Sequence, residues 1–144
     1  MIILGVDLGK TRTGLAVCDK GESFAFPRGI IKEYNREKLF SKIAAEAQKE
    51  GAELIVVGLP RNMDGSEGFK AEESREAAEK LKALSGLPVA LWDERCTTVL
   101  AHQSLHLNGK NAKNSKDVVD TVAATLILED YLRYRKRGQS REQD

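Results

Sequence analysis

The order of the predicted strands and helices is the feature of this sequence that most restricts its fold. Three segments with strand character come first, and helices and strands then alternate before the chain ends in helices. The predicted strands cover residues 2–7, 13–19, 23–31, 53–60 and 87–94, and the predicted helices cover 35–51, 67–85, 97–107 and 115–137. A hairpin start followed by helical crossovers predicts an α/β fold, with a mixed five-stranded sheet and helices on both faces.

Length and composition predict one domain. The 144 residues are 41% apolar and 31% charged, and we expect a single domain over 1–137 followed by a polar tail over 138–144. With 23 basic and 22 acidic residues the net charge is +1, so overall charge does not indicate a nucleic-acid partner. The sequence shows no signal peptide and no apolar run of membrane length, and its two cysteines lie far apart, so we expect free thiols in the cytoplasm.

An aspartate interrupts the first apolar run. Asp7 follows Ile2, Ile3, Leu4 and Val6, a pattern typical of a buried central strand. An unpaired carboxylate there would cost several kcal/mol. Strand alternation puts glycines 5 and 9 on the same face as Asp7, which we interpret as open space for a ligand beside the carboxylate. The alternative is an aspartate at a strand end that accepts hydrogen bonds from neighbouring N–H groups.

Two further acids lie beside buried positions. Glu94 comes where the fifth predicted strand ends, and Asp120 lies near the start of the last predicted helix. Asp120 shares a helix face with the apolar stripe Ala123, Ala124, Ile127 and Tyr131. It is therefore either directed toward the sheet as a site residue or a structural acid stabilised by the helix dipole. Asp117 lies one turn earlier and either joins the site or belongs to a frayed end.

A cluster of three carboxylates would require a cation. Oxygen ligands alone favour Mg²⁺ or Mn²⁺ over zinc, and Mg²⁺ commonly takes its remaining ligands from phosphates. Two such ions can activate a water and stabilise a leaving oxygen. If Asp7, Glu94 and Asp120 converge, the reaction that suits them best is metal-assisted hydrolysis of a nucleic-acid backbone.

Four ordered motifs resemble the YqgF-type (RuvX) family of pre-16S rRNA nucleases and Holliday junction resolvases. They are "GVDLGKTRTGLAVCD", "IVVGLPRNMDGS", "DERCTT" and "DVVDTVAATLILEDYL". The resemblance implies a ribonuclease H-like fold and a divalent-metal nuclease that processes the 5′ end of pre-16S rRNA in the cytoplasm, with ribosomal precursor particles as partners. It implies Asp7, Glu94 and Asp120 as the catalytic acids. RuvC-type resolvases use four acids, which would make Asp117 the fourth.

Basic residues near these motifs are candidates for phosphate contacts. They are Lys10, Arg12, Arg61, Arg95, Lys110, Lys113 and Lys116. Arg95 is equally well explained by pairing with Asp93, and the lysines of 108–116 by an exposed surface. Few aromatic residues lie near the motifs, so we expect recognition of backbone or shape rather than base stacking.

Other functions remain open from the sequence alone. One alternative is a resolvase acting on four-way DNA, and another is a non-catalytic nucleic-acid-binding assembly factor that keeps the acids for structure. A DxG-containing phosphate loop also opens ATPases of the actin and sugar-kinase type, but those need two such domains. His102 and His106 have a zinc-compatible spacing without a completing ligand set, so partly exposed helix histidines explain them better. The sequence does not distinguish a monomer from a dimer.

Overall fold

The computed structural model describes residues 1–60, 68–93 and 112–143, and their side chains apart from those of 69, 112–121 and 138–143. The strands are β1 (Ile3–Asp7), β2 (Arg12–Cys18), β3 (Ala25–Lys32), β4 (Leu54–Leu59) and β5 (Val89–Asp93). The helices are α1 (Arg36–Glu50), α2 (Phe69–Ser85) and α4 (Ala112–Gln143). The last helix is longer at both ends than predicted, and the helix predicted over 97–107 lies outside the described residues.

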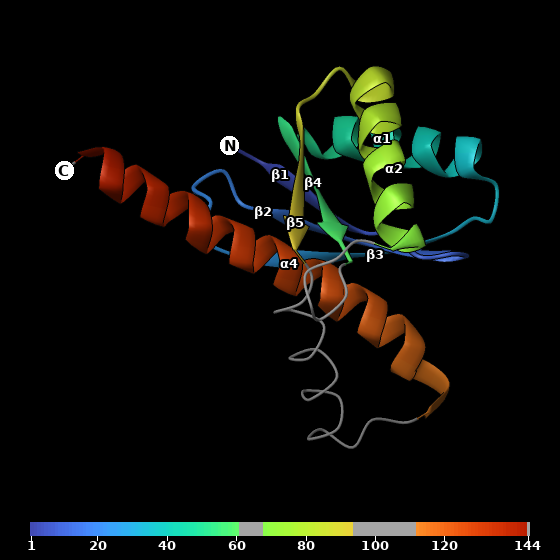
Figure 1. The fold of residues 1–144 in the computed structure, drawn as a ribbon. Helices are drawn as coiled ribbons and strands as arrows, with labels where there is room; N and C mark the ends of the chain where they lie inside the picture. The colour runs from blue at the N-terminus through green and yellow to red at the C-terminus, as the bar shows by residue number, and fades with distance from the viewer. Residues whose placement is uncertain (61–67, 94–111, 144) are drawn as a thin grey trace.

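One sheet of five strands organises the fold (Figure 1). The strand order is β3-β2-β1-β4-β5. Strands β1, β2 and β3 are antiparallel neighbours, whereas β1, β4 and β5 run parallel. The predicted mixed sheet is confirmed. Pro27 lies in the edge strand β3, a position in which a residue without a backbone N–H is tolerated.

Local sequence signals fix the ends of α1. Asn35 is the N-cap, and its side chain accepts a hydrogen bond of 3.0 Å from the Lys38 N–H. Gly51 ends the helix with a φ of 74°, a left-handed conformation that favours glycine. The predicted cap residues at both ends are therefore confirmed.

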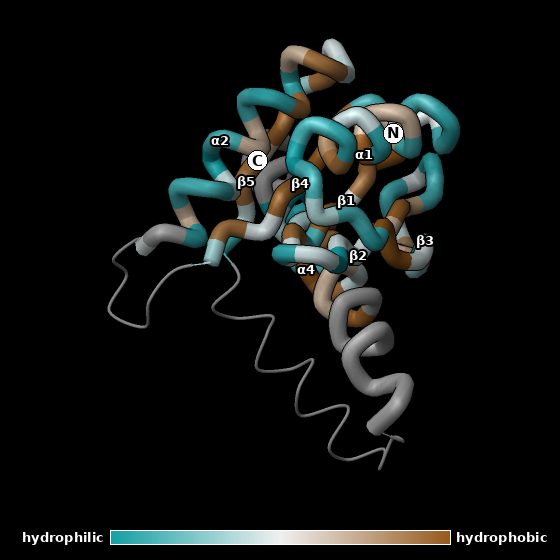
Figure 2. The backbone as a smooth tube through the Cα atoms, turned by 90° about the vertical axis from the view of Figure 1, so that its right-hand side faces the viewer, coloured by the Kyte–Doolittle hydropathy of each residue, from teal (hydrophilic) through white to brown (hydrophobic). Residues whose placement is uncertain are grey.

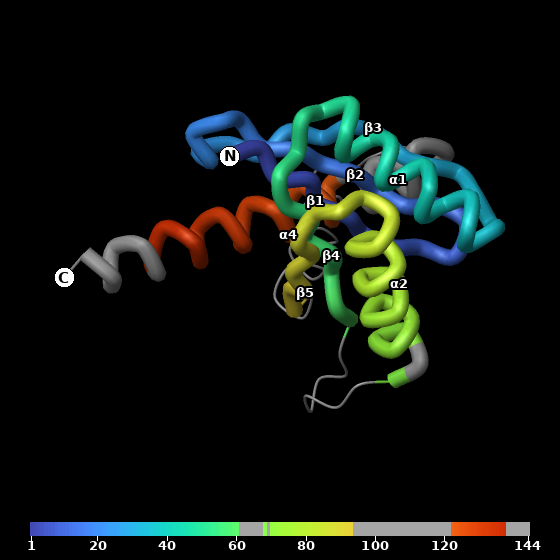
Figure 3. Tube along the Cα trace, turned by 90° about the horizontal axis from the view of Figure 1, so that it is seen from above, coloured from blue at the N-terminus to red at the C-terminus, as the bar shows by residue number. Residues whose placement is uncertain are grey.

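Helices α1 and α2 cover one face of the sheet, which we call the α1/α2 face (Figures 1 and 3). Hydrophobic colour follows the strands in Figure 2, whereas α2 alternates between hydrophobic and hydrophilic stretches. Side chains from both helices and from the central strands form one apolar cluster on this face, including the fully buried Leu4, Ile43, Ile55 and Leu81. This cluster closes the α1/α2 face with aliphatic packing.

Helix α4 covers the opposite face, which we call the α4 face (Figure 1). The predicted stripe is confirmed for Ala123, Ala124 and Ile127, which are buried, while Tyr131 is partly buried. Leu128 and Leu132 are also buried there, although they were not part of the predicted stripe. Among the described residues, none of the helices is both long enough and apolar enough to cross a membrane.

Candidate active site

Asp7 is the last residue of β1 and is half-buried. It lies on the α4 face, because strand alternation gives it the same side as Ile3 and Gly5. Ile3 belongs to the apolar cluster of that face, and a Cβ added to Gly5 would lie 3.0 Å from the Leu128 Cβ and 3.3 Å from the Ala124 carbonyl oxygen. The predicted strand alternation of Asp7 with Gly5 agrees with this placement.

The direction of α4 relates Asp7 to the start of that helix. Helix α4 runs opposite to β1 across the sheet (Figure 1). The step from Gly5 to Asp7 is about 6.6 Å along the strand, and one helical turn rises about 5.4 Å. Because Gly5 lies against Ala124 and Leu128, Asp7 lies alongside the preceding turn of α4, which contains residue 120. The backbone of Asp120 is described, but its side chain is not.

The sheet register connects Asp7 to β5. Val6 pairs with Val57, so the next pair in this parallel register is Asp7 with Gly58, and Gly58 pairs with Trp92. Trp92 packs against the α4-face cluster. Asp7 and Trp92 therefore lie on the same face on either side of a glycine, with Cα atoms about 10 Å apart at the usual strand spacing. Glu94, the next residue in the sequence after β5, lies outside the described residues.

The glycines beside Asp7 do not provide open space, contrary to our interpretation of the sequence. At Gly5 an added Cβ would meet α4, and at Gly9 it would lie 1.9 Å from the Arg12 carbonyl oxygen. Gly5 is needed for close approach of the helix, and Gly9 for a tight turn between β1 and β2. Sequence alternation identified the face correctly but could not show what fills it.

An arginine from α1 holds this turn in place. Arg36 Nη1 donates to the Gly9 carbonyl oxygen at 3.0 Å, and Arg36 Nη2 donates to the Lys10 carbonyl oxygen at 3.1 Å. The buried Thr13 hydroxyl accepts a weaker bond of 3.4 Å from the Gly9 N–H. These bonds fix the segment that follows Asp7. Sequence analysis missed Arg36 because its contact depends on where α1 starts relative to the hairpin.

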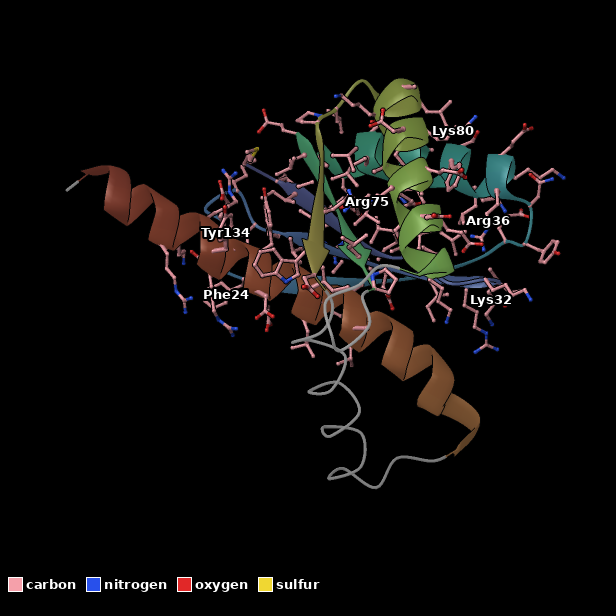
Figure 4. All side chains as sticks on the ribbon, in the orientation of Figure 1. Phe24, Lys32, Arg36, Arg75, Lys80 and Tyr134 are labelled. Atoms are coloured by element: carbon pink, nitrogen blue, oxygen red, sulfur yellow. The ribbon has the colours of Figure 1, made fainter. Side chains whose placement is uncertain are left out.

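Basic side chains gather at the same end of the sheet. Lys10 is exposed in the turn, and Arg12 is half-buried at the start of β2. Lys32 is the cross-strand partner of Arg12 on β3, and it lies with Arg36 at one end of the molecule (Figure 4). Lys32 was not predicted as a site residue, since its place depends on a register that includes a bulge between Leu15 and Ala16.

Several predicted site residues cannot be placed. Arg61, Glu94, Arg95 and Lys110 lie outside the described residues, and the side chains of Lys113, Lys116, Asp117 and Asp120 are not described. Within the described part of the chain, no group of three or more potential metal ligands is found. The structure thus brings Asp7 near the backbone of residue 120 and leaves the three-acid cluster a prediction.

Similarity to known proteins covers almost the whole chain. The RuvX family model, whose description is Holliday junction resolvase, matches residues 1–134. A protein of Anaeromyxobacter sp. (strain Fw109-5) named "Putative pre-16S rRNA nuclease" is 41% identical over 132 residues, covering 92% of this chain and 96% of the relative. A protein of Chloroflexus aurantiacus with the same name is 36% identical over 143 residues, covering 99% and 94%.

Solved structures show the same fold at low identity. RuvC of T. thermophilus in complex with a Holliday junction substrate superposes with a TM-score of 0.61 at 17% identity, covering 93% of this chain and 96% of that one. The fowlpox virus Holliday junction resolvase gives a TM-score of 0.55 at 15% identity, with coverage of 93% and 99%. The fold is therefore a RuvC-like ribonuclease H fold, as predicted, and the chain belongs to the RuvX family.

Proposed function

We propose that this protein is a divalent-metal-dependent nuclease that hydrolyses phosphodiester bonds in nucleic acid, with Asp7, Glu94 and Asp120 as the acids of its site. The observation that carries the proposal is the position of Asp7, half-buried at the end of β1 and alongside the turn of α4 that contains residue 120. Family membership supports the activity, because the description of the matching family model is Holliday junction resolvase.

The donor chemistry of the proposed site fits Mg²⁺ or Mn²⁺. All three side chains offer carboxylate oxygens, which hard divalent cations prefer, and half-burial of Asp7 leaves it reachable from solvent. Asp117, one turn before Asp120, would supply a fourth carboxylate. When bound, the metal would supply an activated water and stabilise the leaving oxygen. The protein itself would orient the scissile phosphate, and the Arg36-held turn would keep Asp7 in position.

The basic residues at this end would hold the sugar–phosphate backbone. Lys10 and Arg12 flank the turn next to Asp7, and Lys32 extends the positive surface onto β3. Charged donors give strong, sequence-independent contacts with phosphates. Arg61, Arg95, Lys110, Lys113 and Lys116 are proposed to extend these contacts.

Pre-16S rRNA is the proposed substrate, within ribosomal precursor particles in the cytoplasm. The two relatives above, which are 41% and 36% identical to this chain over nearly its whole length, carry the name "Putative pre-16S rRNA nuclease". A four-way DNA junction is the second candidate, favoured by the fold shared with RuvC in complex with such a junction. Both substrates present closely spaced phosphates to a basic surface.

The test compares the wild type with Asp7→Asn on labelled pre-16S rRNA and on a four-way DNA junction, with Mg²⁺, Mn²⁺ or EDTA. We expect cleavage of one substrate, no cleavage in EDTA, and at least a ~100-fold lower rate in the variant, since a charged metal ligand is worth several kcal/mol. Glu50→Gln removes the same charge from the far end of α1 and should keep the wild-type rate. Full activity of Asp7→Asn would refute the three-acid site. Intact binding without cleavage by the wild type would favour a non-catalytic assembly factor.

A further inference from the structure

Three aromatic side chains on the α4 face form a contact group, which we call the aromatic cluster: Trp92, Tyr131 and Tyr134. The Trp92 ring centroid lies 6.0 Å from that of Tyr131, nearly perpendicular to it, and 5.5 Å from that of Tyr134. The two tyrosine centroids are 6.2 Å apart. Within the described residues the buried indole N–H of Trp92 donates no hydrogen bond, so ring contacts rather than a polar bond hold the indole.

The ion pair of Arg135 with Glu22 lies next to Tyr131 of the aromatic cluster. The Arg135 guanidinium carbon lies 6.0 Å from the Tyr131 ring centroid, and Arg135 Nε donates to Glu22 Oε1 at 2.7 Å. Glu22 comes from the turn between β2 and β3, and Trp92 lies in β5 at the other edge of the sheet. These contacts therefore tie Tyr131 to the β2–β3 edge, on the same face as Trp92. A ring that is already fixed loses little side-chain entropy when a ligand stacks on the cluster.

The outer side of the aromatic cluster is open. Tyr134 is 59% exposed although two rings support it from behind. Asp130, one turn earlier on α4, is neutralised by Arg133 at 2.9 Å, and the exposed Arg137 follows three residues after Tyr134. Arg133 also lies 3.9 Å from Glu129, so Arg133 and Arg137 together offset part of the acidic charge that a polyanion would meet on this stretch of α4.

The aromatic cluster and the basic end of the sheet lie on either side of Asp7. Asp7, Gly58 and Trp92 are neighbours across three adjacent strands. The basic Lys32 lies at the end of the molecule opposite Tyr134 (Figure 4). Along α4, residue 134 is about 21 Å from residue 120 at the usual helical rise. A single nucleic-acid strand that is bound at Lys32 and passes Asp7 would thus reach Tyr134 a few nucleotides beyond the cleaved bond.

We propose that the aromatic cluster stacks an unpaired base of the nucleic-acid substrate, with Tyr134 as the stacking surface. This inference rests on the nuclease function proposed above and adds a feature of the substrate: a single-stranded segment beside the cleavage site. Stacking on aromatic side chains is tolerant of base identity, so the aromatic cluster would select unpaired over paired structure rather than a sequence. The sequence led us to expect recognition of backbone or shape rather than base stacking, and this proposal departs from that expectation. Backbone recognition would operate at the basic end, and stacking at the aromatic cluster.

Trp92 is the sole tryptophan of the chain, so its fluorescence reports directly on the aromatic cluster. The probe is a single-stranded RNA of about 12 nucleotides, titrated in EDTA so that no metal-dependent cleavage occurs. We expect quenching on binding, weaker binding of the same strand without bases, and no quenching by a blunt duplex. Tyr134→Ala should raise the dissociation constant about 5- to 100-fold, while Tyr134→Phe should bind as the wild type does. Tyr34→Ala, which removes another highly exposed tyrosine, should have no effect.

The outcomes separate this inference from the proposed nuclease. Equal binding of normal and base-free strands, or unchanged binding by Tyr134→Ala, would overturn base stacking while leaving metal-dependent cleavage intact. Stacking without cleavage by the wild type would overturn the nuclease alone. A wild type that binds no nucleic acid would overturn both. If Tyr134→Ala instead converts a dimer to a monomer in sedimentation, the aromatic cluster is an interface between copies, which also overturns the proposal.

Discussion

The two faces of the sheet are packed by different means. On the α1/α2 face, aliphatic side chains from two helices meet aliphatic side chains from the strands, and fully buried residues extend across the central strands. On the α4 face a single helix approaches so closely that Gly5 has no room for a Cβ, and the row beyond it holds Asp7, Gly58 and Trp92.

This difference separates stability from chemistry in the molecule. Burial of large aliphatic groups is the main source of folding free energy. Both faces bury such groups, but the cluster on the α1/α2 face is the larger, so that face should contribute more to stability. A half-buried acid and a partly exposed aromatic group contribute less to folding, but they present charge and ring faces to a ligand. Substitutions on the two faces should therefore affect different measurements.

The largest expected effect on stability comes from Leu81→Ala in α2. Leu81 is fully buried in the α1/α2 cluster, and its truncation should lower the free energy of unfolding by about 2–5 kcal/mol, measured by urea denaturation. Leu84→Ala is the matched control, because Leu84 lies on the same helix and is 54% exposed. It should change stability by less than about 0.5 kcal/mol. Equal losses in both variants would contradict the proposed role of this face.

Gly5→Ala tests the close approach on the α4 face. The added methyl group would lie 3.0 Å from the Leu128 Cβ, so α4 must shift, at about 1–3 kcal/mol of unfolding free energy. Since the shift moves α4 relative to Asp7, the cleavage rate should also fall in protein that is still folded. Gly68→Ala is the control, because a Cβ there meets nothing within 4 Å. A Gly5→Ala protein with unchanged stability and rate would show that the helix is not held at this distance.

Arg36→Ala should have an intermediate effect. It removes two charged hydrogen bonds to the turn after Asp7, which we expect to reduce the free energy of unfolding by about 1–2 kcal/mol and to weaken nucleic-acid binding. Arg28→Ala breaks an exposed pair with Glu50 at 3.2 Å and a long bond of 3.4 Å to the Pro27 carbonyl oxygen, and it should change stability by less than about 1 kcal/mol. If thermal melting shows the same small loss of stability for Arg36→Ala and Arg28→Ala, Arg36 does not hold the turn after Asp7.

The smallest expected effect is the pH dependence of Glu22→Gln. Burial alone would raise the pKa of Glu22, but hydrogen bonds from Arg135 and from the N-terminal ammonium group bring it below its ordinary value. A lowered pKa in the folded state stabilises the protein above the pKa of an unfolded glutamate, about 4.3. That stability is lost as pH falls through the folded-state pKa. The variant should thus be less stable by up to about 1 kcal/mol at pH 7, and the difference should shrink below about pH 4. A difference that persists in acid would point to packing instead.

Much of the fold was predictable because its signals are local. The apolar runs of β1 and β4, the caps at Asn35 and Gly51, and the crossover order depend on neighbouring residues only, and each prediction is confirmed. The buried stripe of α4 was predicted in part. We chose the residues of the stripe by i, i+3 and i+4 spacing from Asp120, and this choice omitted Leu128, which packs directly against Gly5.

The candidate site was less predictable because it depends on contacts between distant segments. Alternation placed Asp7 on its face, but the roles of Gly5 and Gly9 required the positions of α4 and of the Arg12 carbonyl. The aromatic cluster joins a strand and a helix that share no local pattern, so it emerges only from the sheet register and the direction of α4.

The late position of α4 in the sequence has a consequence for synthesis of the protein. Glu22 and Arg135, which bond across the α4 face, are 113 residues apart. At a translation rate of 5–20 residues per second, about 6–23 s pass between the emergence of these two residues. During that interval the strands and the α1/α2 layer can associate while the other side of the sheet stays uncovered and prone to aggregation. The half-made chain therefore exposes the α4 face of its sheet until the last helix has been synthesised and has docked.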